Sequence, residues 1–238
     1  MSFKEIYVDI MTRNFPDGRY NGFADKFEIL YNELVDYNSK VNLTAVTDMA
    51  GACAKHFADS LLIEEHIPEG ATLCDVGCGG GFPTLPLAIV RSDLKITALD
   101  STEKKLKFVS LMADKLSLNV TTLAARAEEV GQSSQYRENF DCVCARAVAR
   151  LNILSELCVP LTRVGGKFIS CKAALANEEL CEALPGIEKL GGELEMSKDT
   201  VLITESEEQS RAVFVFTKKN GTPSQYPRHY SKISKKPL

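Results

Sequence analysis

The sequence predicts an α/β protein in which a doubly wound, mostly parallel sheet follows an N-terminal helical extension. From about residue 70 onward, short β-rich runs alternate with segments long enough for a helix, which is the pattern of βαβ units. In the first third of the chain, by contrast, apolar residues recur at helical spacing. The length of 238 residues, with an average globular composition, suits one domain with a substantial core.

The N-terminal third carries two helical signals. Four apolar residues form one stripe at helical spacing: Phe23, Phe27, Leu30 and Leu34. A polar stretch over residues 37–48 then interrupts the pattern. At its end, Asp48 can cap a further helix, which we expect to run to about His66.

The remaining elements follow in order along the chain. Five runs are predicted as strands: 72–76, 95–99, 119–123, 140–145 and 167–171. Helices are expected over residues 83–91, 102–117, 151–162 and 176–190. The last two β-rich runs, 201–204 and 211–217, have no helix between them and therefore predict an antiparallel hairpin at the end of the sheet.

Composition excludes several classes of protein. The longest apolar run, residues 85–90, is far too short to span a bilayer, and the N-terminal segment carries charges where a secretory signal needs an apolar stretch. We therefore expect a cytoplasmic protein without a membrane partner. The eight cysteines are expected to stay reduced. Because no Cys-x-x-Cys pair occurs, we expect no metal site.

The net charge of −4 averages two unlike parts of the chain. Residues 218–238 contain six of the 28 basic residues and none of the 32 acidic ones, whereas residues 178–208 are rich in acid. The basic segment lacks periodicity, so we expect it to be disordered or laid on a surface. Such a segment can supply salt-dependent contacts to phosphates, and a plain solubilising tail is the alternative.

The strongest chemical signal is the loop DVGCGGGF, residues 75–82, which follows the first predicted strand and opens a helix. Open α/β sheets bind nucleotides at this place, because glycine lets the backbone approach a ligand closely. The dinucleotide fingerprint is not matched, since its third glycine is replaced by Phe82. The spacing Asp-x-Gly-x-Gly-x-Gly instead resembles motif I of the Rossmann-like S-adenosylmethionine-dependent methyltransferases. The candidate cofactor contacts in this loop are Asp75, Gly77, Gly79 and Phe82.

Three further strand ends carry candidate binding residues. Asp100 ends the second strand, where a carboxylate accepts hydrogen bonds from ribose hydroxyls, although capping of the next helix is an alternative. Ala127 and Glu128 follow the third strand and are placed to edge an adenine, or Glu128 simply favours a helix N-terminus. Arg146 leaves the fourth strand toward the cleft, where it would bind a cofactor carboxylate or an RNA phosphate.

With these motifs assembled, the chain resembles the RsmG family (older name GidB) of bacterial small-subunit ribosomal RNA methyltransferases. The resemblance spans about residues 37–238 and rests on ordered motifs: VNLTAVTD (41–48), KHFADSL (55–61), DVGCGGGFPTLPLAI (75–89), LDS (99–101), RAEE (126–129), ARAVA (145–149) and CVPLTRVGGKFISCKA (158–173). It implies a class I methyltransferase fold, S-adenosyl-L-methionine as cofactor, and N7-methylation of a guanosine in a loop of 16S ribosomal RNA. The cofactor contacts that it implies are Gly77, Phe82, Ala127, Glu128 and Arg146.

The chain departs from the family pattern in three places. Tyr37 stands where the family usually has Trp, and Cys78 replaces a small residue in the glycine loop. The tail YPRHYSKISKKPL lacks the Gly-Thr-Pro that is often present. These departures concern the contacts of the tail and leave the cofactor motifs intact.

The implied chemistry needs little from acid or base groups. Guanine N7 carries a free lone pair, so we assign no general acid or base, and in-line positioning becomes the main catalytic device. The target must lie in a loop or bulge, because the major groove of A-form RNA is deep and narrow. The expected target-base contacts are Asn42, Thr44, His56, Asp59, Arg146 and Lys172. For His56 a structural role, and for Lys172 a solvated strand end, are equally open.

We expect three parts within one compact unit: a helical extension (1–66), a methyltransferase core (67–217) and a basic C-terminal tail (218–238). The expected partner is 16S ribosomal RNA or the small ribosomal subunit, bound by a monomer. Two other functions remain open. The chain could methylate a small molecule with the same core, or it could be a non-catalytic module that only senses the nucleotide.

Overall fold

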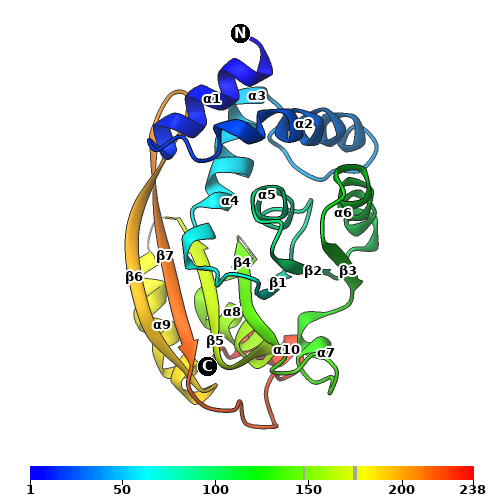
Figure 1. The fold of residues 1–238 in the computed structure, drawn as a ribbon. Coiled ribbons are helices and arrows are strands. Elements are labelled where there is room, and N and C mark those ends of the chain that lie inside the picture. The colour runs from blue at the N-terminus through cyan, green and yellow to red at the C-terminus, as the bar shows by residue number, and fades with distance from the viewer. Residues whose placement is uncertain (147, 174–175) are drawn as a thin grey trace.

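The computed structural model describes residues 1–146, 148–173 and 176–238 and contains a seven-stranded sheet in the order β3-β2-β1-β4-β5-β7-β6 (Figure 1). The strands are β1 (Thr72–Val76), β2 (Lys95–Asp100), β3 (Val120–Ala124), β4 (Phe140–Arg146), β5 (Thr162–Lys172), β6 (Gly192–Ile203) and β7 (Glu208–Lys218). Strands β1 to β5 are parallel, whereas β7 is antiparallel to β5 and β6. The strand order reverses between β1 and β4, so the predicted doubly wound α/β fold is confirmed.

Helices cover both faces of this sheet (Figure 1). The α-helices are α1 (Phe3–Asn14), α2 (Ala24–Asn38), α3 (Met49–Gly51), α4 (Asp59–Leu61), α5 (Thr84–Val90), α6 (Glu103–Leu116), α7 (Ala127–Val130), α8 (Leu151–Cys158), α9 (Ala176–Lys189) and α10 (Tyr230–Lys235). One hydrophobic core joins the N-terminal helices, α5 and α6 to one face, and a second joins α8, α9 and α10 to the other. Within the described residues, no helix is long and apolar enough to cross a membrane.

The central strands read as largely apolar runs because both of their faces are buried. In β1, Leu73 faces the first core and its neighbour Cys74 faces the second, and both are fully buried. The same alternation occurs in β7 at Val213 and Phe214. Burial of an aromatic side chain such as Phe214 stabilises the fold by about 1.5–3 kcal/mol. All eight cysteines are free thiols and seven of them are buried, as expected of small apolar residues.

The segment after Asp48 forms several helical pieces and not the single helix that we predicted. The Asp48 carboxylate accepts a hydrogen bond from the Gly51 N–H at 2.7 Å, so the predicted cap is present. From there α3 leads into a π-helical stretch, η2 (Ala52–Ala58), then into α4 and a short 3-10 turn, η3 (Glu64–His66). Apolar periodicity does not distinguish these helical forms, and π-helical turns are frequent at functional sites.

Strand β6 begins at Gly192, nine residues before the run that we predicted for it. Its first half is an edge with alternating exposed and half-buried residues, many of them charged, which hides the strand signal. The register pairs Gly192 with Lys218 and Ile203 with Glu208, so the predicted antiparallel hairpin is confirmed and is longer than expected.

The C-terminal segment is ordered and packs against the fold, so of the two alternatives for the tail the disordered one is wrong, and the segment does lie on the rest of the molecule. The Arg137 guanidinium donates hydrogen bonds to the carbonyl oxygens of Thr222 and Tyr226, both at 2.6 Å. Ile233 on α10 is fully buried in the second core. Irregular backbone held by a distant arginine leaves no periodic signal in the sequence, which is why the segment resembled a free tail.

Candidate functional site

A cavity of about 310 Å³, here called the glycine-loop cavity, opens at the carboxyl ends of β1, β2 and β3. Four predicted cofactor residues line it, each from the end of its strand or the loop that follows: Gly77, Asp100, Ala127 and Glu128. Parallel strands end at the same edge of a sheet, and this edge lies beside the point where the strand order reverses. The structure therefore brings together residues that are up to 51 positions apart in the sequence.

The glycines of the loop are required for different reasons. Gly77 has φ +74°, and a Cβ there would lie 2.7 Å from Cγ2 of Val148. Gly81 has φ +90°, and its Cβ would lie 2.6 Å from Cδ1 of Leu85. Gly79 has φ +55°, but a Cβ added there would meet no atom within 4 Å, so the conformation alone favours glycine. Glycine at position 77 thus lets the loop backbone lie close to Val148 at the cavity wall, and glycine at position 81 lets the loop pack closely on Leu85 of α5.

Asp100 links the glycine loop to the second strand. Its Oδ2 accepts a hydrogen bond from the Gly79 N–H at 2.9 Å, and its Oδ1 accepts one from the Thr102 N–H at 2.7 Å. A capping side chain binds an N–H group within the first turn of a helix, but Thr102 is the residue before the first residue of α6. Asp100 therefore does not cap that helix in the usual way. Each carboxylate oxygen keeps a second lone pair, and the residue is half-buried, so it can still accept a hydrogen bond from a ribose hydroxyl. The cavity therefore fits the nucleoside half of S-adenosyl-L-methionine.

Asp75 lies beneath the loop and does not line the cavity. The side chain is fully buried, and its Oδ2 accepts hydrogen bonds from the Thr84 hydroxyl at 2.6 Å and the Thr84 N–H at 3.2 Å. Its Oδ1 has no partner among the described residues. Burial raises the pKa of this carboxyl to about 6, although the bonds from Thr84 oppose the shift.

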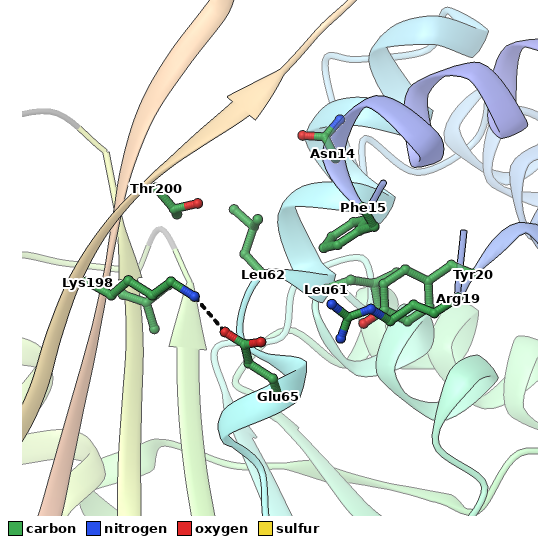
Figure 2. Close-up of a pocket in the computed structure, with 10 residues that line it drawn as sticks. Asn14, Phe15, Arg19, Tyr20, Leu61, Leu62, Glu65, Lys198 and Thr200 are labelled. Atoms are coloured by element: carbon green, nitrogen blue, oxygen red, sulfur yellow. Dashed lines mark hydrogen bonds and ion pairs between the residues drawn. The ribbon is translucent and has the colours of Figure 1, made fainter. Parts of the chain in front are cut away.

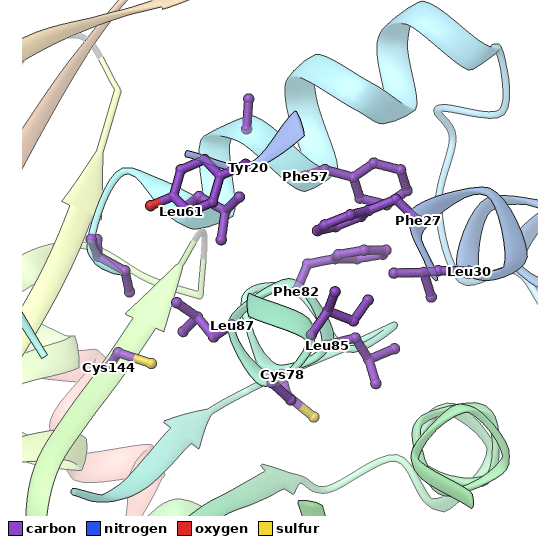
Figure 3. Packing of buried hydrophobic residues seen from close by; sticks show 14 of the residues in the cluster. Tyr20, Phe27, Leu30, Phe57, Leu61, Cys78, Phe82, Leu85, Leu87 and Cys144 are labelled. Carbon is purple, nitrogen blue, oxygen red and sulfur yellow. The ribbon is translucent and has the colours of Figure 1, made fainter. Parts of the chain in front are cut away.

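Phe82 points away from the glycine-loop cavity and into the N-terminal helices. Figure 3 shows its ring beside Phe57 and Phe27, in the core that joins α2 to α5. On its other side it stacks on the imidazole of His56, with ring centroids 4.5 Å apart and an interplanar angle of 12°. A cofactor contact at Phe82 therefore stays a prediction, and only the backbone of this residue adjoins the loop.

His56 is buried between Phe82 and the loop that precedes α3. Its Nε2 lies 2.8 Å from the hydroxyl of Thr44, and its Nδ1 is buried with no partner among the described residues. Burial, with the nearby Arg146 cation, lowers the pKa of the imidazole to about 4. His56 is therefore neutral at neutral pH and has the surroundings of a structural residue.

A second cavity of about 360 Å³, here called the arginine cavity, lies beside the first and shares Val148 with it. Its centre is Asp59, whose carboxylate is bound on both sides. Oδ2 accepts a hydrogen bond from Nη1 of Arg146 at 2.6 Å, and Oδ1 accepts one from Nε of Arg211 at 2.7 Å. Arg146 Nη1 also donates to the Lys55 carbonyl oxygen at 2.7 Å. Asp59 thus fixes two arginines, and because it is buried, whereas Asp100 is half-buried, its remaining lone pairs are poorly accessible to a base.

Lys172 lies at the rim of the arginine cavity and is also paired. Its Nζ lies 2.9 Å from Oε2 of Glu179, which in turn accepts a hydrogen bond from the Leu151 N–H at 3.0 Å. The lysine is therefore part of a partly buried network and not a solvated strand end. Asn42, in contrast, is exposed on the loop before α3, and it lines neither cavity.

A third cavity, of about 150 Å³, lies between the N-terminal helices and β6 (Figure 2). It contains none of the predicted site residues, and an ion pair between Lys198 and Glu65, 2.7 Å long, lies at its wall. Its volume is about half that of the glycine-loop cavity. We therefore place the candidate site at the two adjacent cavities on the carboxyl edge of the sheet.

Three residues of the candidate site were missed in the sequence. Arg211 lies in the first half of β7, and because β7 is antiparallel to β5, this half reaches the edge where the parallel strands end. Val148 reads as an ordinary apolar residue, and yet it lines both cavities. Tyr230, on α10, lines the glycine-loop cavity although the tail carried no signal of order. Of these three positions, only Val148 lies in a motif that we identified, ARAVA (145–149). Ala147 of that motif lies outside the described residues.

Comparison with known proteins gives consistent matches. The profile of the GidB family, described as rRNA small subunit methyltransferase G, matches residues 24–204. The ribosomal RNA small subunit methyltransferase G of Lactobacillus delbrueckii subsp. bulgaricus is 45% identical over 218 residues, which cover 90% of each chain. That of Oceanobacillus iheyensis is 44% identical, over 90% of this chain and 91% of the relative. Among solved structures, TrmN from Thermus thermophilus has a TM-score of 0.52 at 21% identity, covering 76% of this chain and 52% of that chain, which shows the fold alone.

Proposed function

Since the chain belongs to the GidB family of rRNA small subunit methyltransferases G, we propose that it methylates N7 of a guanosine in 16S ribosomal RNA. The methyl donor is S-adenosyl-L-methionine, and the ribosomal RNA is the substrate. We further propose that the protein acts as a monomer in the cytoplasm on RNA in the small subunit. The three-part division into residues 1–66, 67–217 and 218–238 also stays a proposal.

The observation that carries this function is the adjacency of two unlike cavities. The glycine-loop cavity offers backbone and carboxylates, as a nucleoside with hydroxyl groups requires. The arginine cavity offers guanidinium and ammonium groups, as an RNA substrate requires. Val148 lines both, so a donor in the first cavity and an acceptor in the second would meet at this residue.

The residues that would hold the cofactor are those of the glycine-loop cavity. Gly77 would let the backbone approach the cofactor, Asp100 would accept a hydrogen bond from the ribose, and Ala127 and Glu128 would adjoin the adenine. When bound, S-adenosyl-L-methionine supplies an electrophilic methyl group on a sulfonium. The protein contributes position and the exclusion of water, because N7 already carries its lone pair.

The arginine cavity would bind the target nucleotide without blocking N7. A donor on N7 would occupy the lone pair that must attack, so the cationic side chains must contact O6 or a phosphate. Arg146 is suited to this role, since Asp59 and Lys55 engage only its Nη1 within the described part of the chain. Its Nη2 and Nε form no hydrogen bond there. The two bonds at Nη1 hold the planar guanidinium in place and thereby orient the free N–H groups. Asp59 and Arg211 then act as positioning residues.

The decisive experiment is nucleoside mapping on RNA that lacks the modification. Purified protein is incubated with labelled S-adenosyl-L-methionine and either naked 16S RNA or intact small subunits from cells without the enzyme. Digestion and mass spectrometry should find 7-methylguanosine at one position. Label in a pool of metabolites but not in RNA would support the small-molecule alternative. Cofactor binding with no transfer to any acceptor would support the sensing module, and either result would overturn the proposal.

A further inference from the structure

The C-terminal helix α10 brings an aromatic side chain to the glycine-loop cavity. Tyr230, the first residue of α10, lines this cavity together with Ala127 and Glu128. The residue is 40% exposed, its ring pairs with no other aromatic ring among the described residues, and its hydroxyl has no hydrogen-bond partner there. Within the described part of the chain, therefore, neither an aromatic pair nor a hydrogen bond accounts for the position of Tyr230 at the cavity.

The position of Tyr230 is nevertheless fixed by its neighbours. Two residues before it, Arg228 forms a bidentate pair with Glu156 of α8, with Nε–Oε1 at 2.8 Å and Nη2–Oε2 at 2.6 Å. Glu156 is fully buried, and its Oε1 also accepts a hydrogen bond from the Arg228 N–H at 2.9 Å. Three residues after Tyr230, Ile233 is fully buried in the second core. A bidentate, partly buried pair and a core contact hold the helix on both sides of the tyrosine.

The same segment defines which end of the cavity Tyr230 faces. Pro227 packs against Gly131 at the end of α7, where a Cβ on the glycine would lie 2.8 Å from the proline ring. Helix α7 begins at Ala127, and Figure 1 shows α10 close to α7 at the lower edge of the molecule. Ala127 and Glu128 form the predicted adenine edge, whereas Gly77 lines the cavity from the glycine loop after β1. Tyr230 thus lies on the adenine side.

We propose that Tyr230 contacts the adenine of S-adenosyl-L-methionine with its ring, so that the C-terminal segment completes the cofactor site. The proposal rests on the proposed function. Aromatic rings stack on nucleobases with useful affinity in other proteins, and a tyrosine contributes this surface with few rotatable bonds. The segment that the sequence presented as a phosphate-binding tail thereby acquires a contact with the cofactor.

Calorimetric titration with S-adenosyl-L-homocysteine tests the proposal on the full chain. Tyr230→Ala should weaken binding about tenfold, and Tyr230→Phe should stay within about twofold of the wild type, because the ring and not the hydroxyl makes the contact. Ser234→Ala, on the same helix but outside the cavity lining, is the matched control and should bind S-adenosyl-L-homocysteine normally. Thermal unfolding without ligand should show all three variants folded, since Tyr230 is exposed. Equal affinity of Tyr230→Ala and wild type would overturn the assignment.

A fluorescent reporter gives a second, independent measurement. The chain contains no tryptophan, so Tyr230→Trp places a single indole at the cavity. Its emission should change on titration with S-adenosyl-L-homocysteine, with the same midpoint as calorimetry on that variant. Tyr37→Trp is the control, because Tyr37 packs on Phe108, 5.2 Å between ring centroids, and lies outside the cavity lining. If Tyr230→Trp binds the ligand with unchanged emission, the inference fails. If the wild type itself binds no ligand, the proposed function fails instead.

Discussion

The two adjacent cavities of the candidate site are built by different means. The glycine-loop cavity forms around the backbone of the glycine loop and the residues that follow three neighbouring strands, and longer side chains such as Tyr230 complete its wall. The arginine cavity is made by long charged side chains whose positions depend on one another, with Asp59 holding Arg146 and Arg211. The first can therefore be damaged by adding one methyl group, whereas the second is damaged by removing one charge.

The largest effect is expected from removing the charge at Arg146. Arg146→Ala should reduce methyl transfer about 10²–10³-fold, because a positioned donor to the target nucleotide is removed. Cofactor affinity should change little, since Arg146 lies outside the lining of the glycine-loop cavity. Single-turnover transfer to 16S RNA and calorimetry with S-adenosyl-L-homocysteine measure the two quantities separately.

The matched control for that variant is Arg163→Ala, which removes an arginine from another aspartate pair, Arg163–Asp141, at the opposite end of β5. It should transfer methyl groups normally. A parallel drop in cofactor affinity in Arg146→Ala would assign this arginine to the cofactor, as the family resemblance implies. Unchanged transfer would remove it from the site.

Two buried titratable groups, one near each cavity, should respond to pH in opposite directions. The pKa of Asp75 is raised to about 6, so its contribution to stability is present below its ordinary pKa of 3.8 and is lost as pH rises to 6. The pKa of His56 is lowered to about 4, so its contribution is present above 6.5 and is lost as pH falls to 4. Each amounts to about 3 kcal/mol in the unfolding free energy, and between pH 4 and 6 they oppose each other.

Urea unfolding of Asp75→Asn and His56→Gln between pH 4 and 7 separates the two contributions. Relative to the wild type, Asp75→Asn should gain stability as pH rises from 4 to 6, and His56→Gln should gain it as pH falls from 6.5 to 4. A substitution at Asp36, exposed on α2, provides a baseline variant. Curves of the two variants that run parallel to the wild type would contradict the assigned shifts.

A smaller effect is expected from adding a methyl group to the loop. Gly77→Ala should weaken cofactor binding about tenfold, because its Cβ would meet Val148 at 2.7 Å in a left-handed conformation at the cavity wall. Gly79→Ala is the matched comparison, since its Cβ would meet nothing within 4 Å, and its cost should be about 1 kcal/mol of stability. Calorimetry and thermal unfolding distinguish them. Equal decreases in affinity would mean that backbone conformation, and not close approach, sets the role of both glycines.

The smallest effect concerns the basic C-terminal segment. Lys218, Lys219 and Arg228 are paired with acidic residues, and Lys218 is buried against Glu138 and the Val159 carbonyl oxygen. The lysines of the segment that form no ion pair among the described residues are Lys232, Lys235 and Lys236. Replacing these three with alanine should weaken RNA binding a few-fold. The slope of the logarithm of the binding constant against the logarithm of the salt concentration should become less steep by roughly 0.7 for each phosphate that the variant no longer binds. Lys219→Ala is the control, and an unchanged salt slope in the triple variant would exclude the segment from the RNA interface.

What the sequence predicted well is local. The strand, glycine loop and helix around Gly77 follow one another directly, so their residue types and spacing carry the whole pattern. The same holds for the strand ends at Asp100 and Ala127, because parallel strands in one sheet place their loops together. Those predictions depended only on the order of the strands and helices along the chain, and the observed sheet order agrees with them.

What the sequence did not predict depends on contacts between distant segments. Arg211 lies 152 positions after Asp59, and only the antiparallel course of β7 brings it to the site. Asp59 was expected to meet a base, but its pairing with two arginines follows from tertiary packing. The C-terminal segment was interpreted from composition, and neither the burial of Lys218 nor the pair of Arg228 with Glu156 can be seen in composition.

The anchoring of α10 has a consequence for how the protein matures. Chains are synthesised from the N-terminus, so the strands and the glycine loop can fold before α10 exists. The pair between Arg228 and Glu156 and the placement of Tyr230 become possible only after residues 228–230 have been synthesised. A chain that ended after β7 would lack Arg228 and would therefore leave the buried Glu156 carboxylate without its ion pair. Helix α10, which is translated after the whole sheet, thus adds the last wall residue to a cavity whose other walls can form earlier.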